Sequence, residues 1–325
     1  MELVDKMLTG DIRSLARLMT LVENRCSDLP KIMKAIHPYL GKAYIVGVTG
    51  PPGAGKSTLA DKLIAIWRKE GLKIGAVLID PSSPFTGGAI LGDRIRMNRH
   101  ACDPGVFMRS MGSRGSQGGL SRSTKEVVHL LDAFGVDRII VETVGVGQTE
   151  LDIMGVADTV TVILGPESGD TIQTIKAGLM EIADVFVVNK ADRDGAQQMA
   201  AGIKSMLELR DYCTDDWMPP VLLSVASTGE GIGEIVESIR QHKTYHGRDF
   251  SCNPRRRLIR RLELIEVIEN FFRTGLEIAL GAKPFCDYVE SVEKGDISPY
   301  EVLEKLLNDD KLSHLLGKDF PSGRP

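Results

Sequence analysis

The stretch AYIVGVTGPPGAGKSTLADKLIAIWRK, Ala43–Lys69, decides the fold that we expect for this chain. It begins with AYIVGVT, a short run rich in β-branched residues, and ends in ADKLIAIWRK, whose apolar residues recur at helical spacing. Between them lies GPPGAGKST, Gly50–Thr58, which matches the pattern G-x-x-x-x-G-K-[ST]. A strand, a glycine-rich loop and a helix in this order are the context that a phosphate-binding loop requires.

The residue types of this loop explain how it would hold a nucleotide. Glycines let successive backbone N–H groups point at phosphates, and the N-terminus of the following helix adds its positive end. Lys56 is expected to reach the outer phosphates as a catalytic residue, and the Ser57 hydroxyl is expected to bind Mg²⁺. The predicted phosphate-binding residues are Gly53, Ala54, Gly55, Lys56, Ser57 and Thr58.

The rest of the chain predicts an α/β fold. Further strands are expected at 73–79, 105–110, 138–142, 159–164, 184–189 and 221–224, with helical segments between them. Nearly continuous apolar strands separated by helices indicate a mostly parallel sheet covered on both faces, as in a P-loop NTPase. We expect a helical extension at 1–42, in which Asp11 caps the second helix, a P-loop domain at 43–247 and a helical arm at 248–325.

An acidic residue ends one of the expected strands. Glu142 ends the strand at 138–142 and begins ETVGVG, where its carboxylate is placed to hold a Mg²⁺-bound water and Gly145 to let the backbone approach the γ-phosphate. Val146 stands where other nucleotide hydrolases orient the attacking water, and its apolar side chain cannot do so. We therefore expect slow hydrolysis by the chain alone.

Two further acids lie near the same edge of the sheet. Asp80 follows KIGAVLI, and the carboxyl ends of parallel strands converge where such folds bind ligands. We expect Asp80 to position water or Mg²⁺. Asp93, in LGDRIRM, is interpreted either as a Mg²⁺ ligand in the triphosphate state or as a helix cap.

The tetrapeptide NKAD, Asn189–Asp192, predicts the choice of base. The Asp192 carboxylate can accept from both N1–H and N2–H₂ of guanine, whereas adenine has no such pair of donors. Lys190 is expected to lie along the base, and Asn189 to tie the loop to its neighbours. Downstream, SVASTGEGI begins at Ser224 and is expected to bring the Ala226 N–H to the guanine oxygen. GTP and GDP are therefore the predicted ligands.

Composition excludes several classes of partner. Forty basic and forty-four acidic side chains give a net charge of -4, so there is no electrostatic case for nucleic acid or an anionic membrane. The five cysteines are scattered and odd in number, which is typical of reduced thiols in the cytosol. No apolar run approaches the roughly 20 residues that span a bilayer. A cytoplasmic protein is expected.

The C-terminal arm has a broad apolar stripe. Its members are Leu258, Leu262, Ile265, Ile268, Phe272 and Leu276, widened by Leu264, Val267 and Phe271. A stripe of this width is expected to be buried against the body or against another chain. We expect a homodimer formed by the arms, with packing on the P-loop domain as the alternative.

Taken in order, GPPGAGKST, DPSSP, LGDRIRM, MRSMGSRGSQGGLS, ETVGVGQTE, GPESGDTIQTIKAGLMEIAD and NKAD resemble the MeaB/ArgK GTPases associated with methylmalonyl-CoA mutase. The resemblance covers about residues 40–245. It implies a GTPase whose partner is a cobalamin-dependent acyl-CoA mutase, with a role in gating cofactor loading or protecting the loaded enzyme. It also implies that Asp80, Asp93 and Glu142 serve Mg²⁺ and the switch regions, and that the loop Gly165–Lys176 contacts the partner.

Three other functions stay open. A nickel-insertion GTPase needs clustered soft or imidazole ligands, and only His242 and His246 share a helical spacing, which we interpret as an exposed helix end. A protein kinase, the older interpretation of ArgK, would need a base beside an acceptor site. A binding module would use GTP only as a structural ligand.

The cations expected to be available for accelerating hydrolysis are Arg94, Arg109, Arg114 and Lys176.

Overall fold

The computed structural model describes residues 1–80, 100, 102–112, 123–143, 152–166, 178–213, 216–247, 253–280 and 285–308. The strands are β1 (Tyr44–Thr49), β2 (Ile74–Asp80), β3 (Val106–Gly112), β4 (Arg138–Glu142), β5 (Thr159–Leu164), β6 (Val185–Asn189) and β7 (Val221–Ser224). The helices are α1 (Glu2–Leu8), α2 (Ile12–Glu23), α3 (Leu29–Ile36), η1 (His37–Tyr39), α4 (Lys56–Lys69), α6 (Ser123–Phe134), η4 (Asp152–Gly155), α8 (Met180–Ile182), α9 (Ala196–Glu208), α10 (Ile232–Tyr245), α11 (Pro254–Leu280), α12 (Phe285–Glu293) and α13 (Pro299–Asn308). Two compact units divide the chain, Met1–Arg257 and Leu258–Pro325.

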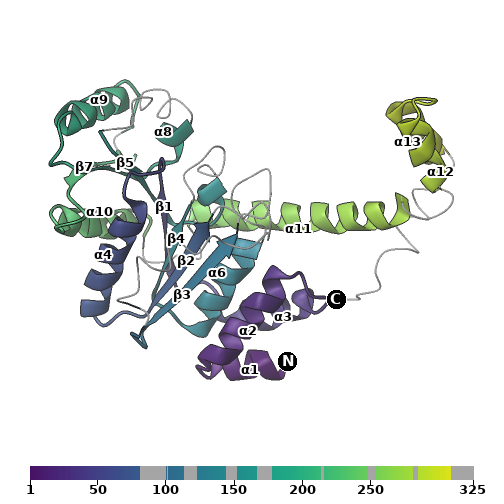
Figure 1. Ribbon diagram of the computed structural model, residues 1–325, viewed down its shortest axis with the longest axis horizontal. Helices are drawn as coiled ribbons and strands as arrows, with labels where there is room; N and C mark the ends of the chain where they lie inside the picture. Colours follow the sequence, from purple (N-terminus) through teal and green to yellow (C-terminus); the bar gives the residue numbers. More distant parts are fainter. Residues whose placement is uncertain are drawn as a thin grey trace. The chain divides into compact units, whose positions relative to one another are not determined.

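The strands form one sheet with the order β3-β2-β4-β1-β5-β6-β7, and every neighbouring pair is parallel (Figure 1). All seven strands lie where the sequence predicts them. The predicted α/β fold with a parallel sheet flanked by helices is confirmed. Because β1 lies between β4 and β5, the loop after β1 leaves the centre of the sheet.

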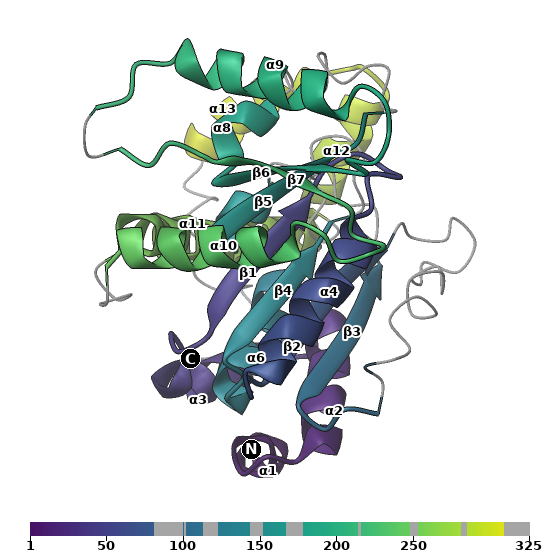
Figure 2. The same cartoon turned by 90° about the vertical axis from the view of Figure 1, so that its left-hand side faces the viewer.

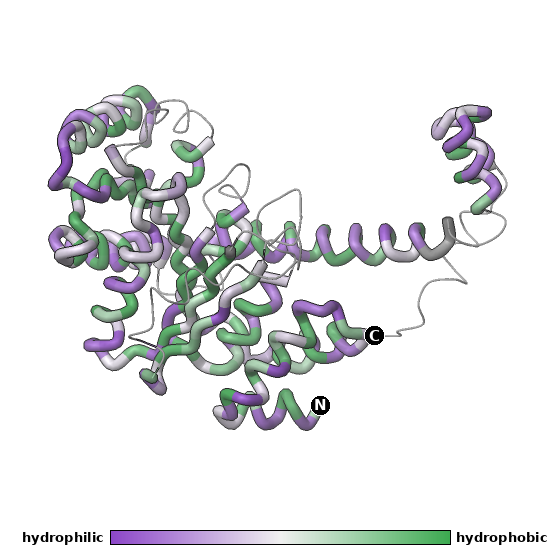
Figure 3. The backbone as a smooth tube through the Cα atoms, in the orientation of Figure 1, coloured by the Kyte–Doolittle hydropathy of each residue, from purple (hydrophilic) through white to green (hydrophobic). Residues whose placement is uncertain are grey.

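Each face of the sheet has its own apolar core. On one face, α4 and α10 cover β1, β2 and β6 through residues such as Leu59, Trp67 and Ile235. On the other face, α2, α6 and α9 contribute Leu15, Leu131 and others to a second buried cluster. Figure 2 shows α4 in front of the strands and α6 behind them, and Figure 3 shows apolar residues concentrated along the strands. Burial on both faces accounts for the continuous apolar runs in the sequence.

The N-terminal helices share the second core with the sheet. As predicted, Asp11 caps α2, because its carboxylate accepts hydrogen bonds from the N–H groups of Arg13 (3.3 Å) and Ser14 (3.0 Å). Arg109 of β3 donates to Glu23 Oε1 of α2 at 2.7 Å. The side chain of Arg109 is therefore held by an ion pair with the N-terminal helices.

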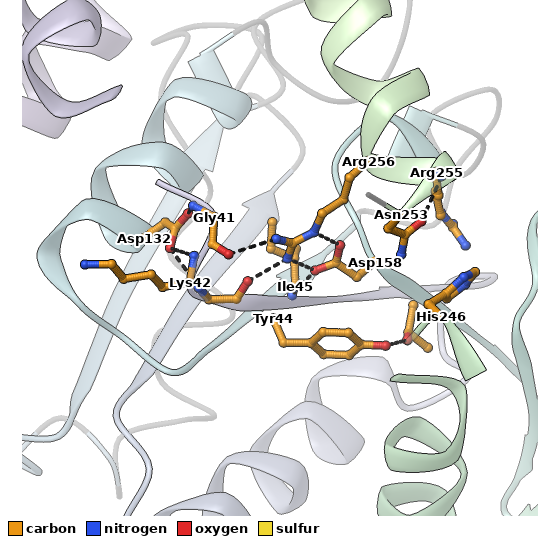
Figure 4. Close-up of polar contacts among 12 residues, drawn as sticks. Gly41, Lys42, Tyr44, Ile45, Asp132, Asp158, His246, Asn253, Arg255 and Arg256 are labelled. Atoms are coloured by element: carbon orange, nitrogen blue, oxygen red, sulfur yellow. Dashed lines mark hydrogen bonds and ion pairs between the residues drawn. The ribbon is translucent and has the colours of Figure 1, made fainter. Parts of the chain in front are cut away.

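The first turn of α11 belongs to the sheet-containing unit. Figure 4 shows the buried Arg256 guanidinium, which donates to both carboxylate oxygens of Asp158 at 2.6 Å. It also donates to the carbonyls of Gly41 (3.0 Å) and Ala43 (2.8 Å). Asp158 in turn accepts from the Ile45 N–H at 2.8 Å. A single arginine thus joins the segments that lead into β1 and β5.

His242 of α10 does not lie at an exposed helix end, so that prediction is wrong. The residue is 1% exposed, its Nδ1 lies 2.8 Å from Thr159 Oγ1, and its Nε2 lies 3.1 Å from Nε2 of His246. Burial, with a smaller contribution from His246, lowers the pKa of His242 to about 3. The imidazole is therefore neutral at physiological pH and acts as a hydrogen-bonding group of the core.

The apolar stripe of α11 is exposed in the single chain. The exposed fractions of its nine residues lie between 42% and 61%. Hydrophobic residues recur from turn to turn along this helix (Figure 3). Among the described residues, no helix is both long enough and apolar enough to cross a membrane.

Candidate nucleotide-binding site

Two glycines of the loop between β1 and α4 combine a positive φ with a close approach that leaves no room for a side chain. Gly50 has φ +136° and Gly55 has φ +95°. A Cβ at Gly50 would lie 1.9 Å from the Ile163 carbonyl oxygen, and one at Gly55 would lie 2.2 Å from Asn189 Nδ2. No side chain caps the N-terminus of α4, which begins at Lys56. The loop is therefore packed closely onto β5 and β6 and presents an uncapped helix N-terminus, an arrangement that favours anions.

The lysine and serine of the loop lie inside it. Lys56 is 7% exposed, and its Nζ donates to the carbonyls of Gly50 (2.9 Å) and Pro51 (3.1 Å). Ser57 Oγ donates to Glu142 Oε1 at 2.6 Å. This contact forms because β4 lies beside β1, with Glu142 in register with Val48. The structure thus brings Ser57 and Glu142 together, whereas Thr58 is exposed.

The oxygen donors at this position fit Mg²⁺. A serine hydroxyl and a glutamate carboxylate are hard ligands of the kind that Mg²⁺ prefers, and they are 9% and 4% exposed. Ser57 and Glu142 would hold the ion, directly or through water. Mg²⁺ bound beside phosphates neutralises the negative charge that develops during phosphoryl transfer.

The other predicted acids are placed less completely. Asp80 is the last residue of β2, the strand beside β4. Leu78 of β2 is in register with Glu142 of β4. The Asp80 backbone therefore lies two residues further along β2, at the carboxyl end of the sheet. Asp93, Gly145, Val146, Arg94, Arg114 and Lys176 lie outside the described residues.

Asn189 connects three segments of the site. Its Nδ2 donates to the Ala54 carbonyl of the phosphate-binding loop at 2.8 Å. Its Oδ1 accepts from the Ala226 N–H at 3.0 Å and from Ser224 Oγ at 3.2 Å. The predicted tie between the NKAD loop and its neighbours is therefore present in the structure. Since an N–H carries one proton, a contact of Ala226 with guanine would have to share or replace its bond to Asn189.

The remaining residues of NKAD turn away from β6. Lys190 has φ +58°, a left-handed conformation that is uncommon for a residue with a side chain and is often found at functional sites. The Ala191 N–H donates to the Ser224 carbonyl at 3.0 Å, which fixes the loop to the end of β7. Asp192 follows on the surface and is exposed.

Two polar pairs near the site have no signal in the sequence. Thr49 and Thr143 meet at 2.8 Å between their hydroxyl oxygens. His100 Nε2 lies 3.0 Å from Asp61 Oδ1, one turn beyond Ser57 on α4. Both pairs join residues that are far apart in the chain, so only the strand order and helix packing bring them together.

The parallel sheet, the glycine-rich loop at the end of its central strand and the NKAD loop beside it define a P-loop nucleotide hydrolase. The chain belongs to the family "Methylmalonyl Co-A mutase-associated GTPase MeaB", whose sequence profile matches residues 15–275. It is therefore a GTPase, as the sequence predicts.

Individual proteins agree with this family. The chain is 49% identical over 312 residues to a Pyrococcus horikoshii protein with a provisional GTPase name, covering 94% of this chain and 98% of that protein. It is 40% identical over 250 residues to "GTPase ArgK" of Escherichia coli, and the match covers 75% of this chain and 76% of that protein. A crystal structure of "LAO/AO transport system kinase" matches 95% of this chain and 97% of its own, with a TM-score of 0.68 and 30% identity.

Proposed function

We propose that this GTPase is a chaperone of a cobalamin-dependent acyl-CoA mutase of the methylmalonyl-CoA type, and that its nucleotide cycle gates cofactor loading or protects the loaded enzyme. The observation that carries the proposal is the match of residues 15–275 to a family whose name states an association with methylmalonyl-CoA mutase. The geometry of the phosphate-binding loop supports the GTP-dependent part.

The proposed roles of the residues follow from their positions. The backbone from Gly53 to Thr58 binds the phosphates, with the Lys56 ammonium facing the outer ones. Ser57 and Glu142 hold Mg²⁺, and Asp80 and Asp93 complete its surroundings or position water. Asn189, Lys190 and Asp192 read guanine, with Ser224 and Ala226 supporting the base loop.

Partner docking is proposed to complete the catalytic site. Val146 cannot orient water, and Arg109 is engaged with Glu23. Charge supplied near the γ-phosphate can accelerate GTP hydrolysis by about 10³ or more. The loop Gly165–Lys176 is proposed to respond to the nucleotide. Its first residue lies next to the phosphate-binding loop, since a Cβ at Gly165 would be 3.8 Å from Ala54 Cα. We therefore expect slow hydrolysis by the chain alone and faster hydrolysis with the mutase.

The decisive experiment is GTP turnover by the full chain titrated with purified mutase. A saturable rise in turnover, together with nucleotide-dependent affinity for the mutase, is the expected result. Lys56→Ala serves as the control for hydrolysis by contaminants. Turnover that stays constant over the whole titration would overturn the partner assignment and leave the GTPase assignment intact.

Substitution of Asp192 tests the base site. Asp192→Asn is expected to weaken GDP binding by about fivefold to a hundredfold or more, because an unpaired polar contact costs about 1–3 kcal/mol. The same variant is expected to bind xanthosine diphosphate more tightly than the wild type does, because xanthine presents an acceptor where guanine presents a donor. Calorimetry measures both. Asp194→Asn, a change at another exposed acid of this loop, is the matched control. Equal affinities of the wild type for ATP and GTP would contradict the assignment.

The exposed stripe of α11 is proposed to form a symmetric homodimer. Two copies of this helix would bury apolar side chains that are 42% to 61% exposed in one chain. The double substitution Ile265→Asn with Phe272→Asn is expected to convert the full chain from dimer to monomer in light scattering. Leu209→Asn, at an 85% exposed position directly after α9, should leave the mass unchanged. A monomeric wild type, or a double variant with the wild-type mass, would exclude this interface.

A further inference from the structure

Two buried threonines meet where β1 and β4 end. Thr49 is the last residue of β1, and Thr143 directly follows the last residue of β4. Their hydroxyl oxygens lie 2.8 Å apart, and the residues are 0% and 2% exposed. The Thr143 N–H also donates to the Val48 carbonyl at 3.1 Å, which continues the ladder beyond the strand. The pair therefore joins the two segments at the point where each leaves the sheet.

Each threonine is adjacent in sequence to a group of the nucleotide site. Thr49 precedes Gly50, whose carbonyl accepts from Lys56 Nζ. Thr143 follows Glu142, whose carboxylate accepts from Ser57 Oγ at 2.6 Å. Each threonine is thus directly bonded, through one peptide group, to a residue of the site.

A hydroxyl pair differs from a contact between apolar groups. Valine would fill the same space in this buried position, whereas a buried hydroxyl is costly unless it is hydrogen-bonded. A hydrogen bond between the two hydroxyls fixes their separation and direction, which a contact between methyl groups does not. The pair is therefore suited to setting the distance between the ends of β1 and β4.

We propose that Thr49 and Thr143 form a positioning element that holds the Glu142 carboxylate beside Ser57 for Mg²⁺ binding. This inference rests on the proposed Mg²⁺ site. The threonines act through Glu142 and the phosphate-binding loop rather than on the ion itself. Removing their hydrogen bond should therefore affect the Mg²⁺-dependent part of nucleotide binding.

Calorimetric GDP binding by the full chain, measured over a range of Mg²⁺ concentrations, tests this role. Thr143→Val is expected to raise the Mg²⁺ concentration for half-maximal tightening roughly five- to tenfold, the effect of losing one buried hydrogen bond. Thr143→Ser keeps the hydroxyl, so its Mg²⁺ concentration for half-maximal tightening should equal that of the wild type. GDP affinity without Mg²⁺ should be the same in all three proteins.

Two further variants separate positioning from stability. In the double variant Thr49→Val with Thr143→Val no hydroxyl is left unpaired, so the midpoint of unfolding should return close to that of the wild type. Its Mg²⁺ requirement should stay raised. Thr161→Val is the matched control, since Thr161 is buried beside Val48 on β5 and its hydroxyl has no hydrogen-bond partner in the described part of the chain.

The outcomes distinguish this inference from the function on which it rests. If GDP binding by the wild type does not respond to Mg²⁺, the proposed metal site fails and the positioning role fails with it. If the wild type responds and the double variant has the same Mg²⁺ midpoint, only the positioning role is overturned. The positioning role is also overturned if Thr161→Val shifts the midpoint as much as Thr143→Val does.

Discussion

Replacing Lys56 by alanine is expected to lower single-turnover GTP hydrolysis by about a hundredfold or more. Lys56 is 7% exposed, and its ammonium lies within the loop, at the carbonyls of Gly50 and Pro51. Removing it takes away a positive charge that we propose faces the transferred phosphoryl group, where negative charge develops in the transition state. The measurement is the rate of phosphate release at saturating protein.

A matched change on the same helix provides the control. Lys69 is exposed at the C-terminal end of α4, so Lys69→Ala removes an equal charge far from the loop. Its turnover should match that of the wild type. Hydrolysis by Lys56→Ala within threefold of the wild type would exclude the role assigned to this lysine.

The second large effect is expected at Arg256, where substitution by alanine should lower the free energy of unfolding by about 3–5 kcal/mol. Asp158 is 1% exposed, and Arg256 supplies two hydrogen bonds to its carboxylate. The variant would leave that charge buried without its partner, and the carbonyls of Gly41 and Ala43 would lose their donor. Urea denaturation of the full chain measures the change.

Two variants make this expectation specific. Arg257→Ala changes the neighbouring exposed arginine and should alter the unfolding free energy by less than about 0.5 kcal/mol. Arg256→Met combined with Asp158→Asn removes both charges and should recover part of the loss, because no uncompensated charge remains. Equal effects of Arg256→Ala and Arg257→Ala would show that the buried ion pair contributes little.

The strands could be predicted from the sequence because the sheet is covered on both faces. The run KIGAVLI, for example, becomes β2 (Ile74–Asp80), between β3 and β4 in the sheet. The loop residues Gly50–Thr58 and the NKAD residues also follow from local pattern, since each group lies within one connection after a strand. The apposition of Ser57 and Glu142 follows once β4 is placed beside β1.

The contacts that sequence reasoning missed join distant residues. Arg109 and Glu23 are 86 residues apart, Thr159 and His242 are 83 apart, and Thr49 and Thr143 are 94 apart. Each depends on which strands and helices are neighbours, and hydrophobic periodicity does not contain that information. The spacing of His242 and His246 indicates only that they share one side of a helix. Contacts with Thr159 of β5 and with the Trp217 ring decide the environment of His242.

The anchoring of Arg256 determines where the chain can be cut for experiments on fragments. This arginine lies beside the first residues of β1 and β5. The phosphate-binding loop follows the last residue of β1, about 20 Å away along this six-residue strand. A fragment that stops at residue 247 would lack this anchor and leave Asp158 without its ion pair. Its failure to respond to a mutase would then report weakened central strands rather than a lost contact surface. Fragments for mapping the partner should therefore end beyond Arg257.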